Sequence, residues 1–485
     1  MDKKRVRKIF SIYWLVLILG LVLFLRLPSL FEPFTYGDEG IYLTLGQALR
    51  KGFVFYRDIH DNKPPLLYFL AALTGSFIQF RLLLFFWSFL TIFVFYELAL
   101  LIFSKNKKAV AIATAAFAIL TSLHTFEGNV ANAENFMMLP TIAGFYLFLK
   151  NNTQKASLLV WLLIGCLFSC ATLFKVPAAF DFAALLILMA LISKPRAILK
   201  NLFLLITGFL LPILLTLIYY VAKGSFQQYL TAAFFQNIPY LASWASDKSQ
   251  TIGLPLALIS RGGLIFAVVA FLLVCRKKIS TEIKLIVLWF SFSLFAALLS
   301  SRPYPHYLLQ TIPALTLSFG LFFFKNKQKI IPFVLTIIFI ASFLIFKFWH
   351  YPNFSYYQNF YQYFLRLKTK EEYFAYFGNH TKTIYQFSEY LKTHTQPEEK
   401  IFIWGNQPSI YALSERLPVG RYTVAYHIQD FDGFEETMRL LTANSPRYII
   451  TEAGIPFPSL EIFLQSNYTL ELQSDRLSLF HRIVR

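Results

Sequence analysis

Residues 31–73, FEPFTYGDEGIYLTLGQALRKGFVFYRDIHDNKPPLLYFLAAL, are the most densely charged connection in a chain that is otherwise largely apolar. After Gly37, apolar residues recur at helical spacing, which predicts a short amphipathic helix lying at a membrane surface. The acidic pair Asp38-Glu39 opens this helix. We expect it to end near Gly52, because glycine suits a helix C-terminus.

A cluster of charged residues follows this helix and is closed by Pro64-Pro65. It contains Arg57, Asp58, His60, Asp61 and Lys63. Residues 66–80 are then predicted to form a second interfacial helix that leads to the next apolar run. The acids and the histidine are residue types that bind a divalent cation, but solvated loop charge is the interpretation we favour, and no metal site is predicted.

The rest of the chain indicates a polytopic membrane protein. Of 485 residues, 56% are hydrophobic and only 15% are charged, and the mean hydropathy is +0.53. A soluble domain is nearer a quarter charged. Eleven apolar runs are candidate transmembrane helices. They are residues 10–31, 81–103, 109–123, 136–149, 156–173, 177–192, 199–222, 256–275, 285–300, 307–324 and 330–349.

The net charge of +19 lies almost entirely in alternate connections between these runs. Counting the N-terminus as the first, the odd connections hold twenty basic residues against two acidic ones, Asp2 and Glu282. The positive-inside rule therefore predicts a cytosolic N-terminus and, after eleven crossings, a C-terminus outside the cytosol. The charge reflects topology and indicates no nucleic-acid partner. The basic residues are Lys3, Lys4, Arg5, Arg7, Lys8, Lys105, Lys107, Lys108, Lys150, Lys155, Lys194, Arg196, Lys200, Arg276, Lys277, Lys278, Lys284, Lys325, Lys327 and Lys329.

Two domains are expected. Residues 1–350 form the transmembrane domain, which includes the first outer loop at 32–80, and residues 351–485 form a soluble extracytoplasmic domain. In the second domain, strand-like runs at 401–404, 448–451, 468–472 and 477–483 alternate with helical ones at 384–391, 408–413 and 434–441, which favours a small α/β layer.

Five short motifs lie in the predicted outer connections. They are the acidic pair Asp38-Glu39, the stretch 56–65 with its Tyr-x-Asp and Lys-Pro-Pro, NVANAENFM with Glu134, FKVP with Lys175, and SRPYPHYLLQTIP at 301–313. In this order they resemble the GT-C class of membrane glycosyltransferases, specifically family 39 (protein mannosyltransferase-like) and the aminoarabinose-transferase-like bacterial group. The likeness covers roughly the first 350 residues, and the stretch IFIWGNQPSIYALSERLPVGRY resembles the variable C-terminal domains of bacterial members.

The resemblance implies a reaction on the outer face of the cell membrane. A hexosyl or pentosyl group would pass from a polyprenyl-phosphate donor to a lipid, glycan or protein acceptor. A carboxylate near the membrane surface can act as general base, and the family pattern assigns this role to the acidic pair, with Asp38 ahead of Glu39. No cofactor is implied, although a divalent cation is not excluded.

The same resemblance suggests which residues bind the donor. The leaving group is an anionic lipid phosphate, which needs cations at the interface, and Lys63, Lys175 and Arg302 are the candidates. The residues expected to shape the sugar and acceptor pocket are Glu134, His306 and Tyr307. We expect the acidic and basic candidates to line one cavity that opens at the outer face.

Each of these residues has a structural alternative. Asp38 and Glu134 are suited to capping helix N-termini. Lys63 and Arg302 can extend toward lipid headgroups as interfacial cations often do. His306 can pack against neighbouring tyrosines without titrating.

Two other functions share the outer-face location. A transporter or flippase of lipid-linked sugars is disfavoured because no internal repeat is visible and the charges gather in outer loops. An envelope-polysaccharide ligase or polymerase is expected to carry an outer loop rich in arginine and histidine, which this chain lacks.

Overall fold

A computed structural model describes residues 3–104, 106–151, 157–193, 195–237, 256–300, 302–324, 329–378, 380–474 and 476–483. These residues form two compact units, each of which combines segments that are distant in the sequence. The helical unit comprises Met1–Ser29, Leu83–Tyr219 and Phe234–Asn353. The mixed unit comprises Leu30–Leu82, Tyr220–Ala233 and Phe354–Arg485. Of the basic residues used to infer topology, Lys105, Lys155, Lys194, Lys325 and Lys327 lie outside the described residues.

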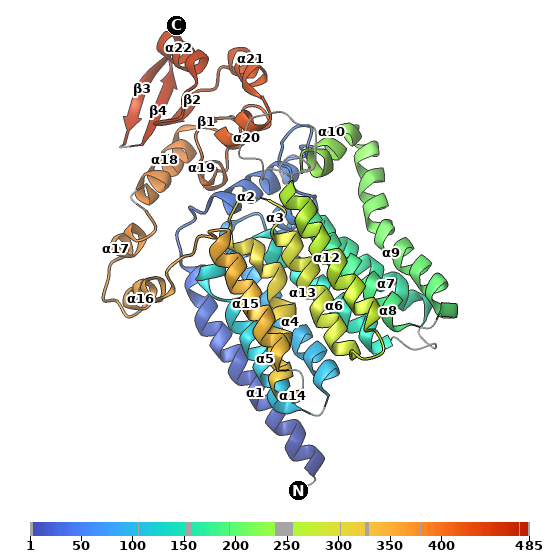
Figure 1. Ribbon diagram of the computed structural model, residues 1–485. Helices are drawn as coiled ribbons and strands as arrows, with labels where there is room; N and C mark the ends of the chain where they lie inside the picture. The colour runs from blue at the N-terminus through green and yellow to red at the C-terminus, as the bar shows by residue number, and fades with distance from the viewer. Residues whose placement is uncertain are drawn as a thin grey trace. The chain divides into compact units, whose positions relative to one another are not determined.

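Each of the eleven predicted apolar runs coincides with a helix in the described part of the chain (Figure 1). Within the residues that the structure describes, four helical stretches are long and apolar enough to cross a membrane: Tyr13–Leu30, Phe77–Phe103, Leu199–Ala222 and Pro305–Phe324. The eleven helices are α1 (Lys3–Arg26), α4 (Phe77–Phe103), α5 (Lys107–Leu120), α6 (Ala133–Asn151), α7 (Leu158–Phe174), α8 (Ala179–Ile192), α9 (Pro195–Ala222), α12 (Leu256–Val274), α13 (Thr281–Ala297), α14 (Ile312–Phe324) and α15 (Ile330–Ile345).

Packing in the helical unit follows the rules of a bilayer. Large apolar side chains on α9 remain exposed, Phe203 at 69% and Ile218 at 64%, as expected for a surface that faces lipid. Helices α7 and α9 approach closely at Gly165 and Gly208, where an added Cβ atom would collide with the backbone of the other helix. Small residues at such crossings allow dispersion contacts where lipid removes the hydrophobic driving force.

Short helices connect the long ones and contribute to the site. They are η1 (Leu27–Leu30), η2 (His124–Phe126), η3 (Val176–Ala178), α10 (Phe226–Leu230), η4 (Thr231–Phe235) and η5 (Pro305–Thr311). The buried Arg26 at the end of α1 donates to Thr121 O at 2.7 Å and to Ser122 Oγ at 3.1 Å. This guanidinium joins the end of α1 to the residues that follow α5.

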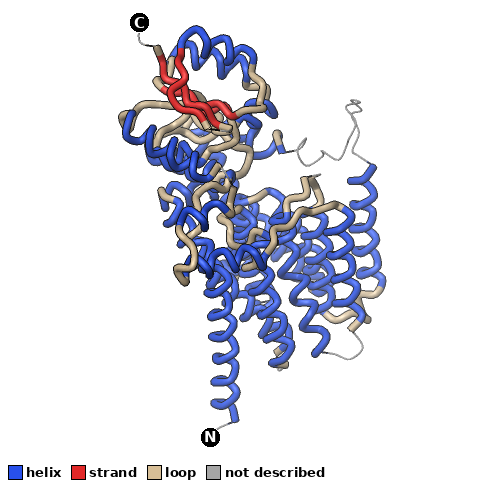
Figure 2. The backbone as a smooth tube through the Cα atoms, turned by 90° about the vertical axis from the view of Figure 1, so that its left-hand side faces the viewer, coloured by secondary structure: helices blue, strands red, loops and turns tan. Residues whose placement is uncertain are grey.

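A four-stranded sheet forms the centre of the C-terminal part, as the alternating pattern predicted (Figure 2). Its strands are β1 (Phe402–Trp404), β2 (Tyr448–Glu452), β3 (Tyr468–Gln473) and β4 (Leu477–Arg482). The order is β1-β2-β4-β3, with β1 and β2 parallel and the other neighbours antiparallel. The register pairs Ile403 with Ile450 and Ile449 with Phe480, so successive residues of β2 face opposite sides of the sheet.

Helices cover both faces of this sheet. One core lies against α20, α21 and α22 and the other against α18 and α19. Four helices, α16, α17, α20 and α22, were not predicted from the sequence. The helices are α16 (Asn353–Phe364), α17 (Lys370–Ala375), α18 (Thr381–His394), α19 (Ser409–Ser414), α20 (Ala425–Asp430), α21 (Phe434–Asn444) and α22 (Pro458–Asn467).

The first outer loop packs with the C-terminal part of the chain. The division expected from the sequence, 1–350 and 351–485, placed this loop with the transmembrane helices, whereas packing groups it in the mixed unit. Helix α2 (Gly37–Arg50) lies against α19. Thr44 Oγ1 donates to Pro408 O at 3.4 Å, and Gln47 Nε2 donates to Ala412 O at 3.0 Å. An added Cβ at Gly40 would collide with Ser409, so this contact needs glycine.

The second helix of the loop is shorter than the predicted span 66–80. Helix α3 (Leu66–Thr74) ends at Gly75, which adopts the left-handed conformation with φ 73°. Glycine reaches this conformation without a steric penalty and is the usual residue at such a helix end. Residues 77–80 therefore begin α4.

A buried ion pair holds α2 to the start of α4. Arg81 Nη2 lies 2.6 Å from Glu39 Oε2, and the two side chains are 3% and 1% exposed. Arg81 also donates to Glu32 O at 2.9 Å and lies 5.0 Å from the centre of the Phe34 ring. These contacts satisfy a guanidinium that would otherwise be costly to bury.

Removing one partner of this pair should destabilise the protein severely. Glu39→Gln keeps the shape of the side chain but removes the carboxylate that interacts most strongly with the buried Arg81 and leaves only the smaller effect of Glu32. Breaking a buried pair in this way costs roughly 3–5 kcal/mol. We expect a clear fall in melting temperature of the purified protein in detergent. Lys392→Gln is the control, because its pair with Glu415 is 45% and 59% exposed and should contribute little. Equal melting temperatures for the two variants would contradict this role of the pair.

Candidate active site

Asp38 and Lys63 lie together at the surface of the mixed unit. Asp38 Oδ2 accepts a hydrogen bond from the Tyr42 hydroxyl at 2.8 Å, and Lys63 Nζ lies 3.7 Å from the same oxygen. The Lys63 ammonium also lies 5.0 Å from the centre of the Tyr42 ring. The two charged side chains are 27% and 25% exposed, so both can reach a ligand.

The structure does not give Asp38 the role of a helix cap. The residue before α2 is Tyr36, and it makes no side-chain capping bond. Asp38 lies inside the first turn, where its charge is favourable at the positive end of the helix dipole. Of the acidic pair, Asp38 is accessible whereas Glu39 is buried and paired with Arg81.

Asp61 is buried, so its interpretation as solvated loop charge is wrong. Oδ2 accepts from the Tyr68 hydroxyl at 2.6 Å, Oδ1 accepts from the Asn62 N–H at 2.6 Å, and His427 Nε2 lies 3.8 Å from Oδ1. Burial opposes ionisation, but Lys63, His427 and the two hydrogen bonds outweigh it and hold the pKa of Asp61 below its usual range. A carboxylate from the loop thus meets a histidine from α20. We call Asp38, Tyr42, Asp61, Lys63, Tyr68 and His427 the loop cluster.

His60 anchors the same stretch through its backbone. Its N–H donates to Arg421 O at 2.8 Å, and its ring packs edge-on against Tyr422 and Phe431. Asp58 forms an ion pair with Arg57 at 2.7 Å. Within the described ranges, no group of three or more histidine, cysteine, aspartate or glutamate side chains is arranged to hold a metal ion.

The helical unit carries a second group of charged residues at the ends of its helices. Glu134, in the first turn of α6, forms an ion pair with Lys175, which follows α7. The Lys175 ammonium lies 3.6 Å from the centre of the Tyr307 ring in η5. The Glu134 side chain is 3% exposed, so it needs this counter-charge. Three predicted site residues from separate connections therefore meet.

His306 links this ion pair to a residue that the sequence analysis missed, Glu127. The Nδ1 atom of His306 is hydrogen-bonded to Glu127 Oε2, and Nε2 lies 3.8 Å from Glu134 Oε1. The ring also stacks on Tyr304 at 5.5 Å, so the predicted packing against tyrosine is present. We call Glu127, Glu134, Lys175, His306 and Tyr307 the helix-end cluster.

The backbone around Glu127 is strained. Its φ of 53° is uncommon for a residue with a side chain, and such strain concentrates at functional sites. Asn132 donates to the Glu127 carboxylate at 3.2 Å, and Asn135 donates to its carbonyl at 3.1 Å. The signal available in the sequence was the position of Glu127-Gly128 directly before NVANAENFM.

Arg302 lies in the helical unit, half-buried, with its N–H donating to Ser300 Oγ at 3.0 Å. Its role as a phosphate ligand stays a prediction. So does the shared cavity, because the loop cluster and the helix-end cluster belong to different units. What the structure brings together is Asp38 with Lys63, and Glu134 with Lys175, His306 and Tyr307.

Solved structures of membrane glycosyltransferases are similar to this chain. For ArnT from Cupriavidus metallidurans bound to undecaprenyl phosphate the TM-score is 0.60 at 14% identity, over 97% of this chain and 98% of that chain. For the apo state of the same ArnT the TM-score is 0.59 at 16% identity, over 98% of this chain and 98% of that chain. For the Archaeoglobus fulgidus oligosaccharyltransferase in complex with Zn and sulfate the TM-score is 0.50 at 13% identity, over 90% of this chain and 68% of that chain. The sequence matches no family model and no curated protein.

At these identities the similarity establishes the fold. The chain has the GT-C fold, a polytopic helical membrane architecture with a small C-terminal sheet, and the fold class predicted from the sequence is confirmed. The resemblance to the GT-C class, including its aminoarabinose-transferase-like group, is confirmed at the level of fold.

Acidification should loosen the mixed unit through His427. Burial keeps the pKa of His427 below its ordinary value of 6.5, although the neighbouring carboxylates of Asp61, Asp38 and Asp430 favour the charged form. The unfolded chain therefore takes up the proton first, and the stability from neutral His427 is lost as the pH falls below 6.5. Between about pH 7.5 and pH 5.5, the melting temperature of the wild type should fall further than that of His427→Gln. Identical pH dependence would contradict this assignment.

Proposed function

We propose that this protein is a membrane glycosyltransferase that moves a sugar from a polyprenyl-phosphate donor to an acceptor outside the cytosol. The observation that carries the proposal is the accessible Asp38 carboxylate beside the Lys63 ammonium, on a chain with the GT-C fold. The similar ArnT structure holds undecaprenyl phosphate, which supports a lipid-linked donor.

In the proposed step, Asp38 is the general base. An acceptor hydroxyl or phosphate oxygen attacks the anomeric carbon, the bond from that carbon to the phosphate oxygen breaks, and Asp38 takes any proton that the nucleophile releases. The Tyr42 hydroxyl fixes the direction of the carboxylate by donating to Oδ2. Partial exposure leaves space for an acceptor to approach, which the buried Glu39 lacks.

The leaving polyprenyl phosphate carries negative charge that cations must stabilise. Lys63 is proposed for this role in the loop cluster, and Lys175 and Arg302 in the helical unit. Because Lys175 is already paired with Glu134, a phosphate would share its ammonium with that carboxylate. Lysine suits such sharing because its ammonium has three donors.

The sugar and the acceptor are proposed to lie against the helix-end cluster. Glu134, Glu127 and His306 offer hydrogen-bonding groups that their mutual contacts hold in place, and Tyr307 offers a ring. Glu39 is proposed as a positioning residue, since its pair with Arg81 fixes the helix that carries Asp38.

The proposed orientation places the N-terminus in the cytosol and the mixed unit outside it, on the charge bias between connections. No cofactor is proposed, because the glycosyl phosphate bond is itself the activated bond. The alternative transporter function would require the intact lipid-linked sugar to cross the membrane.

Asp38→Asn should reduce sugar transfer by about 10²–10⁴-fold, because it removes the proton acceptor while preserving size. Transfer is measured as labelled sugar moved from polyprenyl-phosphate donors to membrane acceptors by the purified protein. Expression and melting temperature should stay close to those of wild type.

Glu371→Gln, an exposed acid on α17 in the same unit, is the matched control and should transfer normally. If Asp38→Asn turns over like this control, Asp38 is structural. Asp38→Ala separates the two roles further, because a structural role predicts loss of stability and a catalytic role predicts loss of turnover.

A further inference from the structure

A basic cleft of about 510 Å³ separates the first outer loop from the sheet-bearing part of the mixed unit. The first outer loop contributes Lys51, Phe53 and Arg57 to its lining, after the end of α2, and the C-terminal part of the chain contributes Lys400 and Arg421. The volume is within the range of 300–1,000 Å³ that holds small ligands. None of these residues belongs to the loop cluster or to the helix-end cluster.

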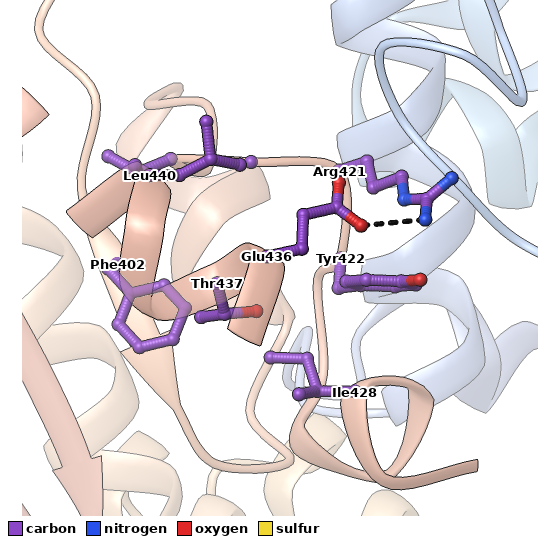
Figure 3. A pocket seen from close by; sticks show the side chains of 9 residues that line it. Phe402, Arg421, Tyr422, Ile428, Glu436, Thr437 and Leu440 are labelled. Carbon is purple, nitrogen blue, oxygen red and sulfur yellow. Dashed lines mark hydrogen bonds and ion pairs between the residues drawn. The ribbon is translucent and has the colours of Figure 1, made fainter. Parts of the chain in front are cut away.

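The charges in the cleft do not cancel. Four cationic side chains line it against two carboxylates, and each carboxylate is already paired with an arginine. Arg57 lies 2.7 Å from Asp58, and Arg421 lies 2.7 Å from Glu436, the pair drawn in Figure 3. Among the side chains that line the cleft, two positive charges are therefore in excess, those of Lys51 and Lys400.

Neutral groups contact both lysines that line the cleft. The Lys51 ammonium donates to the carbonyls of Pro397 at 3.1 Å and Glu415 at 3.3 Å. Burial, with a smaller effect of Arg416, lowers the pKa of Lys51 and outweighs the carboxylates of Glu398 and Glu415, which favour the charged form, so this ammonium would gain from a further anion. The Lys400 ammonium lies 5.0 Å from the centre of the Phe53 ring.

The floor of the cleft depends on a glycine. Gly420 has φ 88°, and an added Cβ would lie 3.2 Å from the Leu440 side chain. A small recess adjoins this point and shares Arg421, Glu436 and Leu440 with the cleft, but it is too tightly packed to admit a ligand. Figure 3 shows the apolar side chains of this recess beside the Arg421–Glu436 pair. The cleft itself combines its cations with the apolar side chains of Phe53, Val419 and Leu440, so a ligand with one charged end and one less polar face fits its lining.

We propose that this cleft binds an anionic sugar residue of the acceptor, one that carries a phosphate or a carboxylate. The inference rests on the proposed function, because it gives the acceptor a second point of attachment on the unit that carries Asp38. Lys51 and Lys400 bind the anionic group, and Phe53 and Leu440 contact the sugar ring. Two charge-assisted contacts at one anion match the stronger class of hydrogen bonds.

The experiment measures binding of glucose 1-phosphate, glucuronate and glucose to the purified full-length protein in detergent, by titration calorimetry. The protein carries Asp38→Asn throughout, so that binding is read without turnover. We expect both anionic probes to bind and glucose to bind at least tenfold more weakly. Adding Lys51→Gln and Lys400→Gln should weaken the binding of both anionic probes by tenfold or more and leave the affinity for glucose unchanged.

Lys370→Gln is the matched control, because Lys370 lies 5.2 Å from the Phe374 ring, as Lys400 does from Phe53, and it is outside the cleft. Lys63→Gln tests the other cation site. Anion binding that survives Lys51→Gln with Lys400→Gln but disappears with Lys63→Gln would overturn the proposal. So would equal affinity for glucose and the anions.

The measurements distinguish a failure of the binding proposal from a failure of the proposed function. If the wild type transfers no sugar but anion binding depends on Lys51 and Lys400, the cleft is confirmed as an anion site and the proposed glycosyl transfer is contradicted. If the wild type transfers sugar and the variant with both Lys51→Gln and Lys400→Gln binds anions as tightly as Lys370→Gln does, glycosyl transfer is supported and the proposed anion site is contradicted.

Discussion

Burial of charge constrains this structure more than any other physical effect. An ion that loses its water costs several kcal/mol unless a counter-charge and hydrogen bonds replace that water. Glu39 meets Arg81, Glu134 meets Lys175, and Glu127 meets His306. Each pair joins segments far apart in the sequence, so the same contacts that make buried charge tolerable also fix how loops and helix ends lie within their unit.

This constraint separates two kinds of charged residue. A carboxylate that forms an ion pair with a buried arginine, such as Glu39, holds the backbone in place. Asp38 is the next residue in the chain, yet it stays partly exposed with a tyrosine hydroxyl and an ammonium beside it. The two adjacent acids thus have different surroundings, because neighbouring residues on a helix point about 100° apart and only one of them can face the core. The catalytic role proposed for Asp38 would therefore depend on a helix that the Glu39–Arg81 pair anchors.

Much of the fold was predictable from the sequence, because transmembrane helices and strands produce local patterns of apolar and polar residues. The eleven apolar runs, the helix opening at Asp38-Glu39 and all four strands followed from periodicity. Contacts between distant segments did not follow. The meeting of Asp61 with His427 depends on docking of the first loop with the C-terminal part, and Glu127 became visible only once His306 was placed beside it. The early end of α3 turned on a single left-handed glycine, Gly75, inside an apolar run.

The proposed glycosyl transfer requires that this membrane protein cleaves a lipid-linked sugar donor. The most direct measurement reconstitutes the purified protein into liposomes with a polyprenyl-phosphate sugar labelled in the sugar, adds a membrane extract as the acceptor source, and follows both products by mass spectrometry. We predict that free polyprenyl phosphate and labelled acceptor appear together in equal amounts. Movement of the intact labelled donor to the opposite leaflet, with no polyprenyl phosphate released, would contradict the claim and identify a transporter.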